Sequence, residues 1–158
     1  MPRYGYAAEA RRVHRYRETQ LASLWSSLLR EVREHLEVAQ YAAAPYSTAP
    51  VAAAPYHLAT AARLLETMAG VVENRRAELR SRRGGRTEFN RVCAYADQLA
   101  HALKQIGVAQ AAADWRRYGS SIYSDIQDVK RELPEMGQTS QIAPILGYDP
   151  CLAAWLQG

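Results

Sequence analysis

The chain has 158 residues, with 20 Lys and Arg side chains against 16 Asp and Glu, which gives a formal net charge of +4. It holds no apolar run of about 18 residues and no amino-terminal secretory signal, so we expect neither a membrane-spanning nor a secreted protein. Cys93 and Cys151 have no CxxC partner, which disfavours a four-ligand zinc site. They suit free thiols in a reducing compartment. A disulfide between them is the alternative if the protein comes from a hyperthermophile.

The first predicted element is a helix over about residues 7–42. Its apolar residues recur at steps of three and four, as one face of a helix requires. They are Leu21, Leu24, Trp25, Leu28, Val32 and Leu36. Because the alternating pattern of a β-strand is missing here and elsewhere, the sequence predicts an all-α fold.

A proline-rich segment at 44–56 follows, in which the string Ala-Ala-Ala-Pro-Tyr occurs twice, ending at Tyr46 and at Tyr56. Each proline lacks an amide donor and disfavours helix before it, so we expect an elbow between two helices. The second helix is predicted over about 57–80, with one apolar face. That face holds Leu58, Ala62, Leu65, Ala69 and Val72. The basic, glycine-containing loop that ends at Arg86 is the predicted domain boundary.

Two long apolar stripes follow the loop. Thr87 is a predicted N-cap with Glu88 in the first turn, and the helix that follows should stop at Gly107. A second stripe begins at Val108, includes Ile122, Ile126, Val129 and Leu133, and ends at Pro134. Asp149 and Pro150 predict the start of a short last helix. We therefore expect a helix-turn-helix arm over 1–86 and a small helical bundle over 87–158.

Charge is divided unevenly between these two regions. Residues 1–86 hold 14 Arg and 8 Glu, a net of +6, whereas residues 87–158 hold 6 basic and 8 acidic side chains, a net of −2. This asymmetry indicates a polyanionic partner for the first region, and Arg can hold two phosphate oxygens at once. A GC-rich genome would explain Arg in place of Lys, but not its concentration before residue 87.

The apolar faces of the two arm helices turn cationic towards their far ends. The face of Leu21 and Trp25 continues backwards into Arg17 and Arg11, and the face of Val72 continues into Arg76 and Arg80. A face that leaves the protein core and follows a phosphate backbone has this pattern, but so do helix ends that fray, or arginines that extend over a core edge. The predicted DNA-binding residues are Arg11, Arg12, Arg15, Arg17, Arg75, Arg76, Arg80, Arg82, Arg83 and Arg86.

The arm also carries six tyrosines, which suit contacts to phosphate, sugar or bases, or contacts between proteins. They are Tyr4, Tyr6, Tyr16, Tyr41, Tyr46 and Tyr56. Catalytic patterns are weak. The four histidines are dispersed in sequence, Asp97 and His101 suit a surface hydrogen bond, and Gly84-Gly85 lacks the spacing of a phosphate-binding loop. We predict a non-enzymatic protein with no cofactor and no metal.

The second half of the chain resembles the major capsid proteins of filamentous archaeal viruses, the rudivirus, lipothrixvirus and tristromavirus group. The resemblance covers roughly residues 90–148 and is greatest in Ala102-Leu-Lys-Gln-Ile-Gly107, within Tyr95–Gly107. It continues through the alanine-rich segment that follows, the region from Tyr118 to Tyr123, and Ile145-Leu-Gly-Tyr148.

The resemblance implies dimers whose helical arms wrap linear double-stranded DNA in A form, while the bundles form the wall of a filamentous virion. It implies a partner that is the chain itself or a paralogous capsid protein, and a location in the virion, assembled in the host cytoplasm. The arm here is longer and richer in Arg than in the rudivirus type, which favours enveloped relatives with paired paralogues and a possible envelope contact. The alternatives are a cellular DNA-binding or nucleoid protein and a helical small subunit of a nucleoprotein complex.

Overall fold

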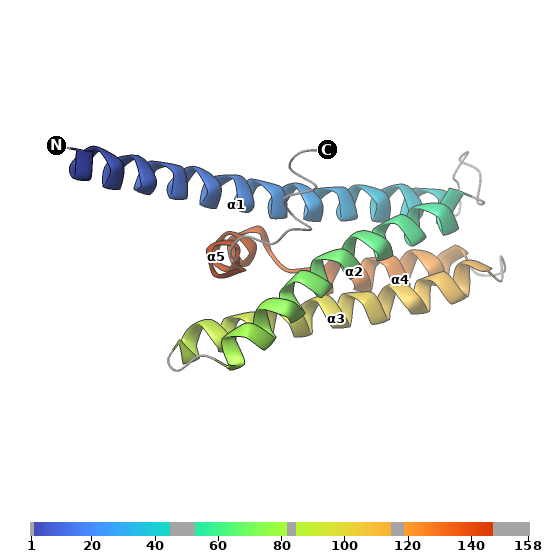
Figure 1. The fold of residues 1–158 in the computed structure, drawn as a ribbon. Coiled ribbons are helices and arrows are strands. Elements are labelled where there is room, and N and C mark those ends of the chain that lie inside the picture. The colour runs from blue at the N-terminus through green and yellow to red at the C-terminus, as the bar shows by residue number, and fades with distance from the viewer. Residues whose placement is uncertain (1, 45–52, 82–84, 115–118, 147–158) are drawn as a thin grey trace.

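The computed structural model describes the backbone of residues 2–44, 53–81, 85–114 and 119–146, and side chains from Ser23 onward within those ranges, apart from 113–121 and Met136. In chain order the helices are α1 (Pro2–Ala43), α2 (Ala53–Arg80), α3 (Arg86–Asp114), α4 (Gly119–Glu132) and α5 (Met136–Leu146) (Figure 1). No strand occurs in these ranges, so the predicted all-α fold is confirmed. The predicted short helix after Asp149 lies outside the described residues.

Helices α1 and α2 run antiparallel and come together at the proline-rich elbow (Figure 1). The last turn of α1 closes with a hydrogen bond from the Ala44 amide to the Tyr41 carbonyl (3.1 Å), directly before Pro45, which cannot continue the helix. The prediction that α2 begins near residue 57 was wrong by one turn. It begins at Ala53, because Pro55 then lies in the first turn, where an amide donor has no partner in any helix.

Helix α3 begins two residues earlier and ends seven residues later than predicted. Gly85 has a φ of 72°, which glycine adopts without strain, and its carbonyl accepts the Phe89 amide (2.9 Å). Thr87 therefore lies inside the first turn and is not the N-cap. The predicted stop at Gly107 was also wrong, since α3 continues to Asp114. Ile106 and Ala109 are both fully buried on either side of Gly107, and this packing outweighs the low helix propensity of one glycine.

The stripe predicted from Val108 to Leu133 is not one face of one helix. Val108 is 47 % exposed, whereas Ile122, Ile126, Val129 and Leu133 are buried on α4 and just beyond it, as predicted. Helix α5 was not predicted. Its first turn is capped by Gln138, whose side-chain oxygen accepts the Glu135 amide (3.0 Å).

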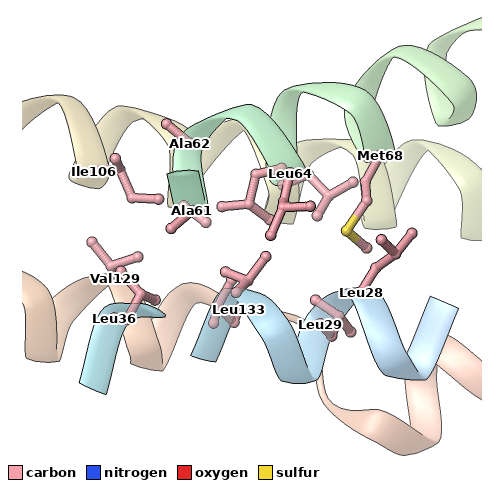
Figure 2. Close-up of a cluster of buried hydrophobic side chains, with 14 of the residues drawn as sticks. Leu28, Leu29, Leu36, Ala61, Ala62, Leu64, Met68, Ile106, Val129 and Leu133 are labelled. Atoms are coloured by element: carbon pink, nitrogen blue, oxygen red, sulfur yellow. The ribbon is translucent and has the colours of Figure 1, made fainter. Parts of the chain in front are cut away.

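The described helices share one hydrophobic core. Leucines of α1 point towards alanine, leucine and methionine side chains of α2, and Ile106, Val129 and Leu133 join them from α3 and α4 (Figure 2). Helix α5 adds Ile142, Ala143 and Leu146. The predicted boundary at Arg86 thus divides two regions of different charge, while the core of the described residues spans both of them.

A buried amide fixes α1 against α4 inside this core. The Gln40 side chain is 6 % exposed, and its Nε2 donates to the Gln127 Oε1 (2.9 Å) and to the Tyr123 carbonyl (3.3 Å). Its Oε1 accepts from the Lys130 Nζ (3.3 Å), and Lys130 also lies 3.8 Å from the Glu37 carboxylate. Because every polar atom of the amide has a partner, its burial is tolerated, and it selects one register of α1 on α4.

Candidate nucleic-acid interface

The arginine-rich segments of the chain lie at one end of the molecule. Because α1 and α2 are antiparallel, the start of α1 and the end of α2 both lie far from the elbow, and α3 begins beside the end of α2 (Figure 1). The two helices diverge from the elbow, and α5 lies between the middle of α1 and the far end of α2 in this view. The far end of the molecule, called here the basic end, therefore consists of residues 2–22 of α1, and of 73–81 and 85–91 around the α2–α3 loop.

The structure describes the predicted DNA-binding arginines to different extents. It describes the backbone but not the side chains at Arg11, Arg12, Arg15 and Arg17, which lie along one continuous stretch of α1. Arg82 and Arg83 lie outside the described residues. The contacts of Arg75, Arg76, Arg80 and Arg86 are described.

Arg75 is engaged within the protein. Its side chain is 20 % exposed, and its Nε donates to the Ile145 carbonyl at the end of α5 (2.7 Å). The same guanidinium makes an ion pair with the Glu78 carboxylate (2.7 Å). Since a carbonyl at a helix end lacks a partner within its own helix, this arginine satisfies it and ties α2 to α5. Its main role here is structural.

The next arginines along the helix are progressively freer. Arg76 is 29 % exposed and pairs with Glu73 one turn earlier (2.7 Å). Arg80 and Arg86 are exposed, and neither pairs with another described residue. Arg91, which was not among the predicted site residues, is also exposed on the first turns of α3. Only its place after the predicted boundary excluded it, so a rule based on distance from the loop would have found it.

The predicted change of α2 from an apolar to a cationic face holds only in part. The buried face continues past Val72 to Leu79, which is 6 % exposed, so the core extends to the last turn of the helix. Arg76 and Arg80 stand beside that face and leave the core edge towards solvent. They match the alternative of arginines extending over a core edge as well as they match a phosphate-binding face.

Among the residues whose side chains the structure describes, the exposed large apolar ones lie at the opposite end of the molecule, near the elbow. Tyr41 and Tyr56 are 59 % and 64 % exposed, and Val38, Val108 and Tyr123 are about half exposed. They come from the end of α1, the start of α2, the last turns of α3 and the first turns of α4, which lie together at this end (Figure 1). The other four tyrosines of the predicted arm set have no described side chains.

Two of the dispersed histidines meet near the elbow. The Nδ1 atoms of His35 on α1 and His57 on α2 lie 2.9 Å apart, with the ring centroids 5.2 Å apart and the planes tilted by 32°. Sequence reasoning missed this pair, because the register of α1 on α2 decides which positions of the two helices face each other. Asp97 and His101 are both exposed on α3, with no contact between them among the described residues.

Further tests of function class come from the described ranges and from comparison with known proteins. Within those ranges, no group of three or more metal-ligating His, Cys, Asp or Glu side chains occurs, and no helix has the length and apolar character needed to cross a membrane. A search of family models, curated proteins and solved structures finds no match to the chain. The resemblance to capsid proteins stays a prediction. The residues that carry it, including Tyr95, Ala102 and Ile106, face the core of the bundle.

Proposed function

We propose that the chain is a structural virion protein that coats and wraps linear double-stranded DNA without sequence specificity in a helical filament. The observation that carries the proposal is that the arginine-rich start of α1 and the arginine-rich end of α2 both lie on the side of the molecule away from the elbow, on two diverging helices. The acting unit is a dimer of the chain with itself or with a paralogous capsid protein, and the DNA is in A form, as the resemblance implies.

The length of the first half of α1 supports wrapping in preference to docking on one short site. Residues 2–22 form a continuous helix of about 30 Å, at 1.5 Å per residue, a length comparable to one turn of a duplex. Arginines spread along such a helix can contact successive phosphates, which positions a protein on DNA without reading its sequence. A helix placed along the backbone in this way needs no base contacts.

The test is to mix purified protein with linear double-stranded DNA and to image the product by electron microscopy. Uniform helical filaments on DNA of unrelated sequences are expected, with the circular dichroism spectrum of A-form DNA. A protein that needs its paralogue will form filaments only when both are present, so both mixtures belong in the experiment. Isolated monomers with no retention on DNA at low salt in either mixture would overturn the proposal.

Exposed arginines at the basic end allow a sharper version of this test. Arg80→Gln and Arg86→Gln are expected to weaken DNA binding and to reduce the slope of log K against log salt by about one unit for each lost phosphate contact. Arg63→Gln is the matched control, since Arg63 is an exposed arginine on α2 with no ion pair to another described residue, about 25 Å before Arg80 along the same helix. Equal losses in all three variants would indicate a diffuse charge effect and not an interface. A strong sequence preference that survives competitor DNA would indicate a cellular regulator instead.

A further inference from the structure

One hydrogen bond joins two histidines of different helices beside the elbow. The Nδ1 atoms of His35 on α1 and His57 on α2 lie 2.9 Å apart and the ring centroids 5.2 Å apart, so the two nitrogens lie between the rings and face each other. Both side chains are half-buried, and their chain neighbours Leu36 and Leu58 are fully buried, so the pair lies at the edge of the core. An N–H donor and a nitrogen acceptor at this distance form one hydrogen bond between α1 and α2.

The space between the two nitrogens has room for a single hydrogen. While both rings are neutral, one Nδ1 donates and the other accepts. A first proton from solvent enters at the outer Nε2 of the donor ring, which leaves the bond in place and makes it charge-assisted. A second proton has to enter at the accepting Nδ1 itself. Two N–H groups on two cations then face each other without an acceptor, so the bond is lost and the rings repel each other.

The neighbours of the pair on α1 and α2 offset little of this repulsion. Neither ring has a further hydrogen bond or ion pair among the described residues. On α1, Glu34 precedes His35, and Glu31 lies one turn earlier on the same face. Both carboxylates are exposed to water, which screens their attraction for the rings. On α2, Tyr56 lies edge-on to the His57 ring, with 5.3 Å between centroids, and its hydroxyl holds its proton at acid pH.

The other helices packed against α1 and α2 bring no bound charge to the pair. Lys130 of α4 is held by Gln40 (3.3 Å) and Glu37 (3.8 Å). Glu37 is two residues from His35, about 200° around the helix, so this cluster is on the far side of α1. Helix α5 has no ionisable side chain, and Lys104 of α3 is exposed without an ion pair to a described residue. The remaining charged side chains of α4, none of which makes an ion pair with either ring, are Asp125, Asp128, Arg131 and Glu132.

We propose that the bond between His35 and His57 is an acid-opened latch between α1 and α2. The latch is closed while the pair carries at most one positive charge, and it opens when both rings are charged. Histidine is the side chain that gains charge as pH falls from about 8 to 5, so the latch opens in this range. The unfolded chain binds both protons freely, whereas the closed folded chain excludes the second, so stability falls as pH falls. The proposed DNA binding plays no part in this inference.

The experiment compares thermal unfolding of the full chain at pH 8 and pH 5 with that of His35→Gln, of His57→Gln and of the double variant. From pH 8 to pH 5 the unfolding temperature of the parent chain should fall by about 3–6 °C more than that of either single variant, because only two charged rings repel each other. Since the latch needs both rings, the double variant should match the single ones. Two histidines that act independently would each account for half of the effect, and that additivity would overturn the proposal. His101→Gln, which changes an exposed histidine on α3, should keep the pH dependence of the parent chain.

Nuclear magnetic resonance of the parent chain with ¹⁵N-labelled histidine gives an independent readout. At pH 8 one ring of the pair should carry its hydrogen on Nδ1 and the other on Nε2, and the two rings should titrate in two shared steps, while His101 titrates in one. At pH 5 the amides of residues 38–43 should exchange faster in the parent chain than in His57→Gln, because the end of α1 is no longer tied to α2.

Three outcomes would each overturn the latch. They are single-step titration of both rings, equal amide exchange in the two proteins, and the same pH dependence of unfolding in the parent chain and every variant. Far-ultraviolet circular dichroism identifies a variant that fails to fold, and the other single variant then decides the thermal comparison. If both fail to fold, the histidine resonances of the parent chain decide the question alone.

Discussion

The two ends of the molecule are held together by different interactions. Near the elbow, α1 and α2 bury leucines against α3 and α4, and the Gln40 amide is fully paired in their midst. At the basic end, the pairs between Arg75 and Glu78 and between Arg76 and Glu73 join residues three apart on the surface of one helix. Burial of a leucine contributes about 1.5–3 kcal/mol, whereas a surface ion pair contributes at most about 1 kcal/mol.

Because of this difference, the residues that stabilise the fold and the residues that carry charge occupy different parts of the same helix. On α2 only Leu79 is buried beyond Val72, so Arg76 and Arg80 occupy positions beside the core at small cost to folding. A substitution should therefore affect folding most near the elbow and binding most at the basic end. Arg75 is the exception, because its bond to the Ile145 carbonyl makes it part of the fold.

The largest expected effect on folding is at the elbow end. Leu36→Ala, at a side chain with no exposure, should lower the free energy of unfolding by about 2–5 kcal/mol, because it leaves a cavity between four helices. Val38→Ala, two residues away and 45 % exposed, should change it by less than about 0.5 kcal/mol. Urea denaturation measures both. Equal losses would show that the elbow half of α1 is not packed as described.

The free energy of unfolding is expected to depend on pH through the buried Tyr95 of α3. Burial raises the pKa of Tyr95 to about 12, and its hydroxyl lies 3.1 Å from the Thr139 Oγ1, whose hydrogen bond opposes part of this rise. Between pH 10 and 12 the unfolded chain loses this proton first, so the folded state binds more protons and stability falls as pH rises. The loss reaches about 2 kcal/mol at pH 12, from about 1.36 kcal/mol per unit.

The difference in unfolding free energy between the parent chain and Tyr95→Phe isolates this contribution, since the other tyrosines and lysines titrate in both. Tyr95→Phe also removes the tyrosine hydroxyl that contacts Thr139. The Thr139 hydroxyl still donates a hydrogen bond to the Glu135 carbonyl (3.0 Å). At pH 8 the variant should be less stable than the parent chain. Above pH 10 the difference in unfolding free energy between the two proteins should become smaller. A constant gap from pH 8 to 12 would contradict a buried hydroxyl.

Arginines of the basic end should divide into two kinds. Arg75→Gln should lower the free energy of unfolding by about 1.5–3 kcal/mol, the usual contribution of a hydrogen bond to a charged group. Arg80→Gln, at an exposed side chain, should change it by less than about 0.5 kcal/mol while weakening DNA binding. Denaturation and DNA retention on the same two variants give the comparison. If Arg80→Gln proves as destabilising as Arg75→Gln, the basic end is part of the folding core.

The smallest effects should come from two glycines and have opposite signs. Gly85→Ala places a side chain at a φ of 72° and should cost about 1–2 kcal/mol. Gly107→Ala, inside α3 with nothing within 4 Å of an added Cβ, should stabilise the protein by about 0.5–1 kcal/mol. Thermal unfolding resolves both. A loss at Gly107 would mean that another chain approaches this helix closely.

Periodicity was sufficient to predict the parts of the fold that depend on one helix at a time. The buried positions Leu58, Leu65 and Val72 on α2, and Ile126 and Val129 on α4, follow from their spacing alone. Helix α5 was missed because glycine, serine and Pro144 obscure its pattern, although Thr139, Ile142, Ala143 and Leu146 have the spacing of a buried face. The continuation of α3 beyond Gly107 could not be predicted, since packing against other helices decides where α3 ends.

The candidate sites show the same limit. The concentration of arginine before residue 87 is visible in the sequence, and the antiparallel hairpin brings its two segments to one end. Which arginine is bound to the protein and which is free depends on neighbours distant in sequence, such as Ile145 beside Arg75. The meeting of His35 and His57 likewise required the register of α1 on α2, which no local pattern contains.

The unbroken length of α1 has a mechanical consequence. One helix of 42 residues runs from the packed bundle to the tip of the basic end without a break. A tilt of α1 at the core would therefore displace the whole of its first half as a rigid rod. With about 30 Å of helix over residues 2–22, a tilt of about 10° at the bundle displaces the first turn by about 5 Å. A small change in how two bundles pack would then shift the amino terminus by about one helical turn, and the pitch of any assembly would be set at the core.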